Sequence, residues 1–336
     1  MIWFVIKRLF LLIGMLFGLL AITFSISHVA PGDPASLAAG PDATLEMIEA
    51  IRVKYGLDKP LWEQFVLYVG GIVQGDFGVS VRTTRDVGTD LLRYFPATFE
   101  LVTFSILIAC ILGIPLGMVS ALFRNGFVDH ATRILSVSGM ALPMFWLGLM
   151  LQLWIALSLG WLPLGGRLGL MTEPPPFTTG LYLIDSLLAG QWETFKESLS
   201  HLILPATALC FPALASIMRV NRAEMLEALS QDYVTGARAM GITPWRIICL
   251  YALKNTMIPT LAMVGLRYGW MLGGTVLVES VFDWPGIGLY AVESALASDF
   301  QPIMGVTLLI GLNFMLVNML IDILYAWIDP RLRKNA

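Results

Sequence analysis

The residue types that most often carry chemistry are few and widely separated in this sequence. The cysteines, Cys110, Cys210 and Cys249, match no C-x-x-C spacing, and the histidines at 28, 130 and 201 form no group. No Gly-Lys pair occurs, so the phosphate-binding pattern G-x-x-x-x-G-K-[ST] is absent. The sequence therefore predicts no metal site, no disulfide framework, no enzyme active site and no cofactor bound to this chain.

Arg267 is the one charged residue in the stretch 255–278, which is otherwise long enough and apolar enough to cross a bilayer. A cation at that depth is costly unless it faces the interior of a helix bundle, a partner or water. Two interpretations remain open. Arg267 lines a path for a solute and meets a carboxylate or a carbonyl as the solute passes, or it pairs internally with Asn318 or Asp322.

The composition favours a membrane protein. Of the 336 residues, 57% are hydrophobic and 13% are charged, against about a quarter charged in soluble domains. This excludes most soluble enzymes. The net charge of -3 offers no basic surplus for a nucleic-acid backbone, so nucleic acid is not an expected partner.

Stretches without charge predict where the chain crosses the bilayer, because a span needs about 20 apolar residues. Five such stretches occur, at 9–32, 101–123, 134–166, 198–218 and 300–321. With 255–278 as a sixth, the sequence predicts an all-α membrane protein with six transmembrane helices. The first stretch is longer than the apolar region of a cleaved signal peptide and is expected to be a retained anchor.

Lysine and arginine in the connections predict the orientation. With the N-terminus inside, the short outer loops hold only Arg167 and Lys196. The inner segments hold twelve basic residues: Lys7, Arg8, Arg124, Arg133, Arg219, Arg222, Arg238, Arg246, Lys254, Arg331, Arg333 and Lys334. The bias places both termini in the cytoplasm.

The long polar segments divide the chain into an anchor helix at 1–30, an outer subdomain at 31–97, a five-helix core at 98–328 and a tail at 329–336. In the outer subdomain, apolar periodicity predicts a helix from Thr44 that stops at Gly56 and a second helix after Pro60. This segment either forms a packed subdomain or caps the helix bundle. The acidic residues of the last outer loop, Glu279, Asp283, Glu293 and Asp299, either contact a delivering protein or enforce orientation.

The inner segment 219–256 contains a short helix between charged ends. Asp232 is expected to cap its N-terminus, Ala237 and Ala239 to leave a low surface for close approach, and Gly241 with Pro244 to end it. The segment is either a docking element or a solvated connector, and its length, nearly forty residues in an otherwise minimal protein, favours docking.

This segment resembles the cytoplasmic loop of ATP-binding-cassette importer permeases, in the branch for dipeptides, oligopeptides and nickel. The resemblance extends almost end to end, over these motifs: Pro31-Gly32-Asp33-Pro34, Tyr55-Gly56-Leu57-Asp58-Lys59-Pro60, Gly75-Asp76-Phe77-Gly78, Asp232-Tyr233-Val234, Ala237-Arg238-Ala239-Met240-Gly241, Asn255 with Ile258-Pro259, Trp284-Pro285-Gly286-Ile287-Gly288 and Asp329-Pro330-Arg331.

The resemblance implies a type I importer permease of the bacterial inner membrane that pairs with a second, related permease. It implies that two cytoplasmic ATPase subunits bind ATP and magnesium, and that a periplasmic binding protein delivers di- or oligopeptides. Residues 232–245 would then be the coupling helix, with Ala237, Arg238, Ala239 and Gly241 closest to the ATPase and with Asp232, Tyr233, Met240 and Pro244 beside them. Arg267, Asn318 and Asp322 would belong to the translocation path.

The sequence departs from the family pattern at two places. The broader Glu-Ala-Ala signature is missing and Gly241 lies farther from Pro259 than usual, which restricts the match to the peptide branch; Arg267 stands where an uncharged polar side chain is expected. Alternatives are an importer of the same class for a nickel chelate, glutathione or an oligosaccharide, and a secondary transporter driven by an ion gradient. The latter calls for paired intramembrane acids and inverted repeats, which the sequence does not show.

Overall fold

The computed structural model of the chain describes residues 2–29, 43–54, 56 and 58–328. Within these ranges nearly all regular structure is helical, and strand-like pairing is limited to an isolated antiparallel bridge between Val79 and Asp86. The predicted motif at 31–34, together with Tyr55, Leu57 and the tail at 329–336, falls outside the described residues. The predicted all-α class is therefore confirmed for the part of the chain that can be compared.

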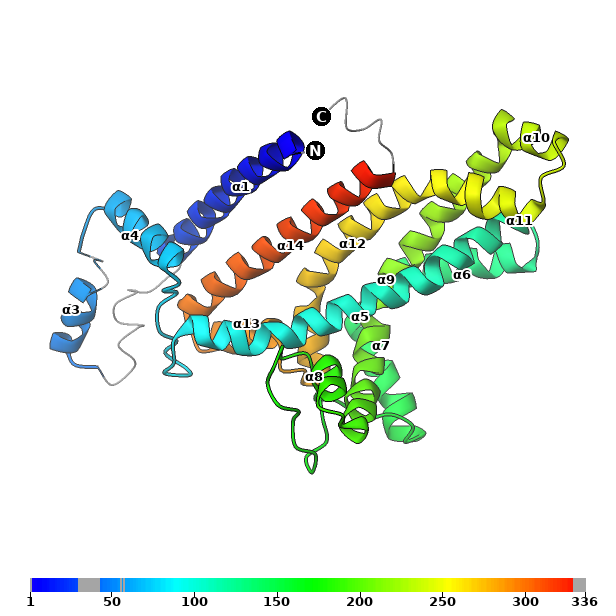
Figure 1. Cartoon of the computed structure of the whole chain (residues 1–336). Helices are drawn as coiled ribbons and strands as arrows, with labels where there is room; N and C mark the ends of the chain where they lie inside the picture. The colour runs from blue at the N-terminus through cyan, green and yellow to red at the C-terminus, as the bar shows by residue number, and fades with distance from the viewer. Residues whose placement is uncertain (1, 30–42, 55, 57, 329–336) are drawn as a thin grey trace. The chain divides into compact units, whose positions relative to one another are not determined.

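The helices follow the chain in the colour order of Figure 1. Their bounds are α1 Ile2–Val29, α3 Leu45–Lys54, α4 Leu61–Gln74, α5 Val87–Leu122, α6 Phe127–Ala141, α7 Met144–Leu151, the π-helix η1 Gln152–Ser158, α8 Tyr182–Leu188, α9 Trp192–Ser230, α10 Asp232–Ala239, α11 Pro244–Arg246, the π-helix η2 Ile247–Ala252, α12 Leu253–Phe282, α13 Ile287–Leu296 and α14 Phe300–Ile328.

Four helical stretches are long and apolar enough to cross a membrane: 87–122, 192–230, 244–282 and 300–324. A fifth follows if the bent pair α6 and α7–η1 is one span, and the apolar part of α1 that can be assessed, Phe10–Ser25, is shorter than the length required. Four to five spans are thus supported in the described residues, and the count of six stays a prediction.

The predicted span at 134–166 does not form one continuous helix. Helix α6 ends at Ala141, α7 begins at Met144, and the two axes differ by 106°. Leu142 is extended, with φ -79° and ψ 126°, because the ring of the following Pro143 disfavours the helical conformation there. By contrast, Pro205, Pro212 and Pro259 lie inside continuous helices.

The chain forms two compact units, residues 1–98 with 285–315 and residues 99–284 with 316–336. The predicted division at residues 30, 97 and 328 rests on membrane sidedness, and it stays a prediction.

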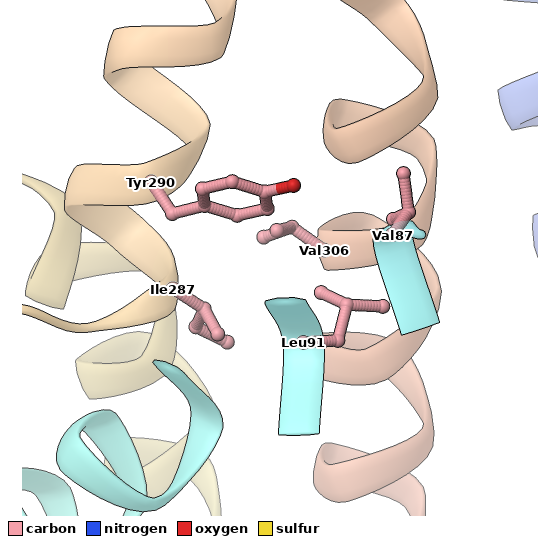
Figure 2. Packing of buried hydrophobic residues seen from close by; sticks show 5 residues of the cluster. All are labelled: Val87, Leu91, Ile287, Tyr290 and Val306. Atoms are coloured by element: carbon pink, nitrogen blue, oxygen red, sulfur yellow. The ribbon is translucent and has the colours of Figure 1, made fainter. Parts of the chain in front are cut away.

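The first unit is held by a small hydrophobic core. Figure 2 shows Val87 and Leu91 of α5, Ile287 and Tyr290 of α13, and Val306 of α14 converging, all of them buried. Elsewhere in this unit the two helices predicted within 31–97 are confirmed as α3 and α4, whereas their side of the membrane stays a prediction. Phe65 of α4 packs edge-on against Phe17 and Phe24 of α1, so α4 is attached to the first helix rather than isolated.

Helix α9 forms the centre of the second unit and packs against α6, α7, α8 and α12. Small residues permit close approach: a Cβ at Gly117 of α5 would lie 2.6 Å from the Met218 carbonyl oxygen, and one at Gly139 of α6 would lie 2.6 Å from the Ala215 Cβ. Membrane helices associate through such small residues because lipid supplies no hydrophobic driving force between helices. The segments α5, α6 and α9 therefore pack backbone against backbone.

Candidate functional site

Helix α10 is the short helix predicted in the inner segment, and it lies at the end of α9 with α11 beside it (Figure 1). It begins at Asp232, after Gln231 in an extended conformation, and no side chain caps its N-terminus. The expectation that Asp232 is the cap is therefore wrong. As the first helical residue, Asp232 instead places its negative charge near the positive end of the helix dipole.

The C-terminus of α10 is closed by a Schellman motif. Gly241 has φ +74°, the Ile242 N–H donates to the Ala237 carbonyl at 3.1 Å, and the Gly241 N–H donates to the Arg238 carbonyl at 3.0 Å. These bonds satisfy carbonyls that the helix end leaves open. Gly241 thus ends the helix as predicted, whereas Pro244 does not: it is the first residue of the next helix, α11.

The inward face of α10 rests on a three-residue core of Val234, Ala237 and Ile247, with Ile242 packed against it. A helix of eight residues is too short to be stable alone, whereas burying a valine or isoleucine side chain stabilises by about 1.5–3 kcal/mol. Ala237 is 1% exposed, so the expectation that it lies at a contact surface is wrong. Its small size instead serves close packing within the chain.

The outward face carries the other residues that were predicted to dock. Asp232, Tyr233, Arg238, Ala239, Met240 and Gly241 are exposed, and Met240 has 74% of its surface accessible. Pro244 and Trp245 of α11 are exposed as well. The face therefore combines the cation Arg238, the small side chain of Ala239 and the large apolar side chains of Met240 and Trp245. This composition is suited to binding another protein.

A second buried cluster joins the ends of α5 and α9 to the short π-helix η2. Ala121 of α5, Met225 and Ala228 of α9, and Ala252 of η2 pack into one buried cluster. On the same side, the Asn255 side chain of α12 donates a hydrogen bond to the Tyr233 hydroxyl. Helix α10 is consequently joined to both α9 and α12.

Asp129 of α6 is a buried carboxylate that the sequence interpretation missed. It binds Arg222 of α9 through two hydrogen bonds, of 2.6 and 2.9 Å, and also accepts from Ser120 of α5. The available signal was a single acidic residue in the short basic segment 124–133.

The predicted path residues lie on α12 and α14. Arg267 is half-buried, and its Nε makes no hydrogen bond to any described residue. Two positions earlier, a Cβ at Gly265 would lie 2.6 Å from Ile321 and 3.3 Å from the Asn318 amide oxygen, so the two helices approach closely here. Asp322 is half-buried one turn further along α14. Along α12, Arg267 lies about 18 Å from Asn255, the residue that forms a hydrogen bond to Tyr233 of α10.

The loop 161–191 is fixed by buried charges that were not predicted. Arg167 pairs with Glu100, and its guanidinium lies 3.6 Å from the centre of the Tyr182 ring. His201, to which no role was assigned, contacts the Gly165 carbonyl through Nδ1 at 2.8 Å. The loop is therefore an ordered surface element rather than a loose connection.

The four acidic residues predicted for the last outer loop are largely used within the chain. Glu279 and Asp299 are buried, Asp299 accepts a hydrogen bond from Ser80 at 2.7 Å, and Glu293 pairs with Arg82 at 2.7 Å. Asp283 is exposed and ends α12 in a left-handed backbone conformation. An acidic docking surface is thus not formed by these four side chains.

No group of three or more His, Cys, Asp or Glu side chains with metal-binding geometry occurs in the described part of the chain. The expectation that this chain binds no cofactor stays a prediction.

Comparisons with known proteins agree with this architecture. Residues 113–334 match the family described as binding-protein-dependent transport system inner membrane component, and residues 1–102 match the N-terminal region of the same class of membrane component. A probable D,D-dipeptide transport system permease protein of Escherichia coli is 46% identical over 95% of this chain and 94% of its own length.

Two further relatives match over essentially the whole chain. A dipeptide transport system permease protein of Alkalihalophilus pseudofirmus is 40% identical over 99% of this chain and 100% of its own. A di/tripeptide transport system permease protein of Pseudomonas aeruginosa is 40% identical over 100% of both. The chain belongs to the family of inner membrane components of binding-protein-dependent transport systems.

Proposed function

We propose that this chain is the permease subunit of an ATP-driven importer and forms, with a second permease, the path for di- or oligopeptides delivered by a periplasmic binding protein. Its relatives support the peptide substrate, since three of them are named for D,D-dipeptides, dipeptides and di/tripeptides. A glutathione transport system permease of Escherichia coli is 37% identical over 98% of the chain, which makes a glutathione-sized peptide the second candidate.

The observation that carries the proposal is the outward face of α10. An eight-residue helix would not persist alone, yet here a separate core and a Schellman motif hold it while Arg238, Ala239 and Met240 remain exposed. Such a face is suited to a groove on a cytoplasmic ATPase subunit. Two such subunits would bind ATP and magnesium and hydrolyse ATP, so this chain itself would not be an enzyme.

The chain is a multi-pass protein of the inner membrane. Both termini are cytoplasmic in the proposed topology, because the basic residues gather in the segments on that side. Residues 31–97 and 161–191 then face the binding protein. Family membership displaces the alternative of an ion-gradient-driven transporter, since the family is defined by dependence on a binding protein.

The proposed translocation path includes Arg267, Asn318 and Asp322. Arg267 offers an Nε without a hydrogen-bond partner among the described residues, and α12 and α14 approach each other at Gly265. A guanidinium with unused donor capacity in a span is suited to a transient contact with a peptide carboxylate.

The test is Ala239→Arg in the assembled importer. Ala239 lies on the face of α10 opposite Val234 and Ala237, so the long side chain leaves the core intact and fills the docking surface. We expect the ATPase subunits to be lost on purification and ATP-dependent dipeptide uptake to fall. Ala189→Arg, at an exposed position of the outer loop, is the matched control and should retain both.

Retention of the ATPase subunits and of uptake in Ala239→Arg would contradict the docking assignment. Uptake by the purified chain in vesicles without ATP or an ATPase subunit would contradict the proposed function as a whole.

A further inference from the structure

The buried carboxylate of Asp129 accepts hydrogen bonds from several donors. Asp129 has no exposed surface and accepts hydrogen bonds from the Ser120 hydroxyl at 2.8 Å and from the Asn125 N–H at 2.9 Å. Arg222 donates through two nitrogens, at 2.6 and 2.9 Å, and Arg133 donates at 2.8 Å. Both oxygens are thus fully used.

The two arginines differ in what they connect. Arg133 lies four residues after Asp129 on the same helix, α6, and is half exposed, so its bond is local. Arg222 lies on α9 and reaches both Asp129 of α6 and Ser120 of α5. Among the contacts of Asp129, the Arg222 pair is the one that joins the α5–α6 hairpin to α9.

The pair lies between the docking helix and the bundle. Arg222 is eight residues before the end of α9 at Ser230, about 12 Å along the helix, and α10 follows directly. The intervening residues Met225 and Ala228 pack against Ala121 at the end of α5. A displacement of α10 therefore reaches α9, which meets the α5–α6 hairpin through the packing at Ala121 and then through the hydrogen bonds of Arg222.

Packing alone already holds these helices together at Gly117 and Gly139. A buried ion pair is a weak contributor to stability, because the cost of removing two charges from water offsets most of their attraction. What the pair adds is a directional connection, since a bidentate bond fixes the orientation of one helix relative to the other as well as their distance.

We infer that Asp129 and Arg222 are positioning residues that make the α5–α6 hairpin move with the docking helix, so that ATP hydrolysis by the partner subunits is coupled to opening of the path. This inference rests on the proposed function. It assigns to the pair a part in coupling, distinct from docking by α10 and from the path at Arg267.

The experiment compares Arg222→Gln with Arg133→Gln in the complete importer reconstituted in vesicles. Each variant removes one cation from the same carboxylate, and each leaves the other arginine, Ser120 and Asn125 in place, so the buried charge stays compensated. The readout is the amount of dipeptide imported per ATP hydrolysed, with ATPase co-purification measured in the same samples.

We expect Arg222→Gln to retain the ATPase subunits and to lower the dipeptide imported per ATP by about fivefold or more, the lower range of coupling between distant sites. Arg133→Gln should match the unmodified protein. Arg222→Lys keeps the charge but loses the bidentate geometry, and its ratio should fall between the two.

An unchanged ratio in Arg222→Gln would overturn the inference, and so would an equal decrease in both glutamine variants. If Arg222→Gln fails to assemble, Arg222→Lys decides: a ratio equal to that of the unmodified protein counts against the inference. Failure of the proposed function is separate, because the unmodified complex would then show no ATP-dependent uptake.

Discussion

The Asn255 side chain donates a hydrogen bond to the Tyr233 hydroxyl at 3.0 Å, and this bond joins helix α10 to the first turn of α12. Tyr233 is partly exposed, so the bond is in contact with water and is a modest one. It nevertheless connects the exposed helix to the helix that carries Arg267.

Tyr233→Phe tests that bond, because it removes the hydroxyl and keeps the ring. A net contribution of about 0.5–1.5 kcal/mol predicts that amide hydrogen exchange in 232–239 accelerates by about twofold to tenfold. Tyr251→Phe, at another partly exposed tyrosine nearby, should leave exchange unchanged. Equal protection in both variants would show that the bond does not hold α10.

Gly241→Ala and Gly236→Ala form a second pair of variants, which we expect to change the stability of α10 in opposite directions. Both positions have open space for a Cβ, but Gly241 has φ +74° whereas Gly236 lies within the helix. Left-handed backbone costs an L-residue about 1–2 kcal/mol, while alanine is favoured over glycine in a helix by about 1 kcal/mol. Hydrogen exchange in α10 should therefore increase in the first variant and decrease in the second; changes in the same direction would contradict this.

Gly117→Ala tests the close approach of α5 and α9. The new Cβ would lie 2.6 Å from the Met218 carbonyl oxygen, which is backbone and cannot move aside alone. Overpacking of this kind costs about 1–3 kcal/mol. The melting temperature in detergent should fall. In the control, Gly273→Ala on an open face of α12, it should be unchanged or slightly higher. Equal melting temperatures in the two variants would show that α5 and α9 do not pack closely at Gly117.

Asp185 gives the loop 161–191 a defined pH dependence. Burial alone would raise the pKa of this carboxyl, but hydrogen bonds from the Thr179 hydroxyl and from the backbone N–H groups of Thr178, Thr179 and Gly180 outweigh burial and lower it. The carboxylate therefore stabilises the loop above the ordinary pKa of an aspartate, about 3.9, and this contribution is lost as the pH falls through the lowered value.

Exchange of amides 178–185 should accordingly accelerate on acidification below about pH 4. In Asp185→Asn the local protection should be weaker at neutral pH and lose this acid dependence. A variant that keeps the same acid transition would assign the transition to another group.

Arg267→Gln tests the proposed path. If the guanidinium meets a peptide carboxylate, loss of a charge-assisted hydrogen bond predicts uptake reduced by about tenfold or more, with assembly intact. Arg267→Lys, which keeps the charge, should retain part of the activity. Full uptake in Arg267→Gln would remove this residue from the path.

Much of the fold and the family could be predicted because the signals are local. The uncharged stretches 101–123, 198–218 and 300–321 fall within or nearly within α5, α9 and α14, and the end of α10 follows from Gly241 alone. The resemblance to importer permeases, which rested on motifs along the chain, is confirmed by the family matches, and with it the type I permease fold.

The features that could not be predicted depend on tertiary structure or on one backbone angle. A hydropathy window averages over Leu142 and Pro143 and cannot detect the bend between α6 and α7. Asp129 and Arg222 are 93 residues apart, so their pairing has no signal in local spacing. Ala237 and Ala239 differ by two positions, and which of them faces inward depends on where α10 packs.

The length of α9 has a consequence for where docking takes place. At 39 residues it extends about 58 Å if straight, whereas the hydrocarbon layer is about 30 Å thick. Roughly half of this helix must then stand in the headgroups or in water. A soluble subunit that binds the permease there does so in the aqueous phase. Neither the surface of that subunit nor the surface of α10 is then in contact with lipid.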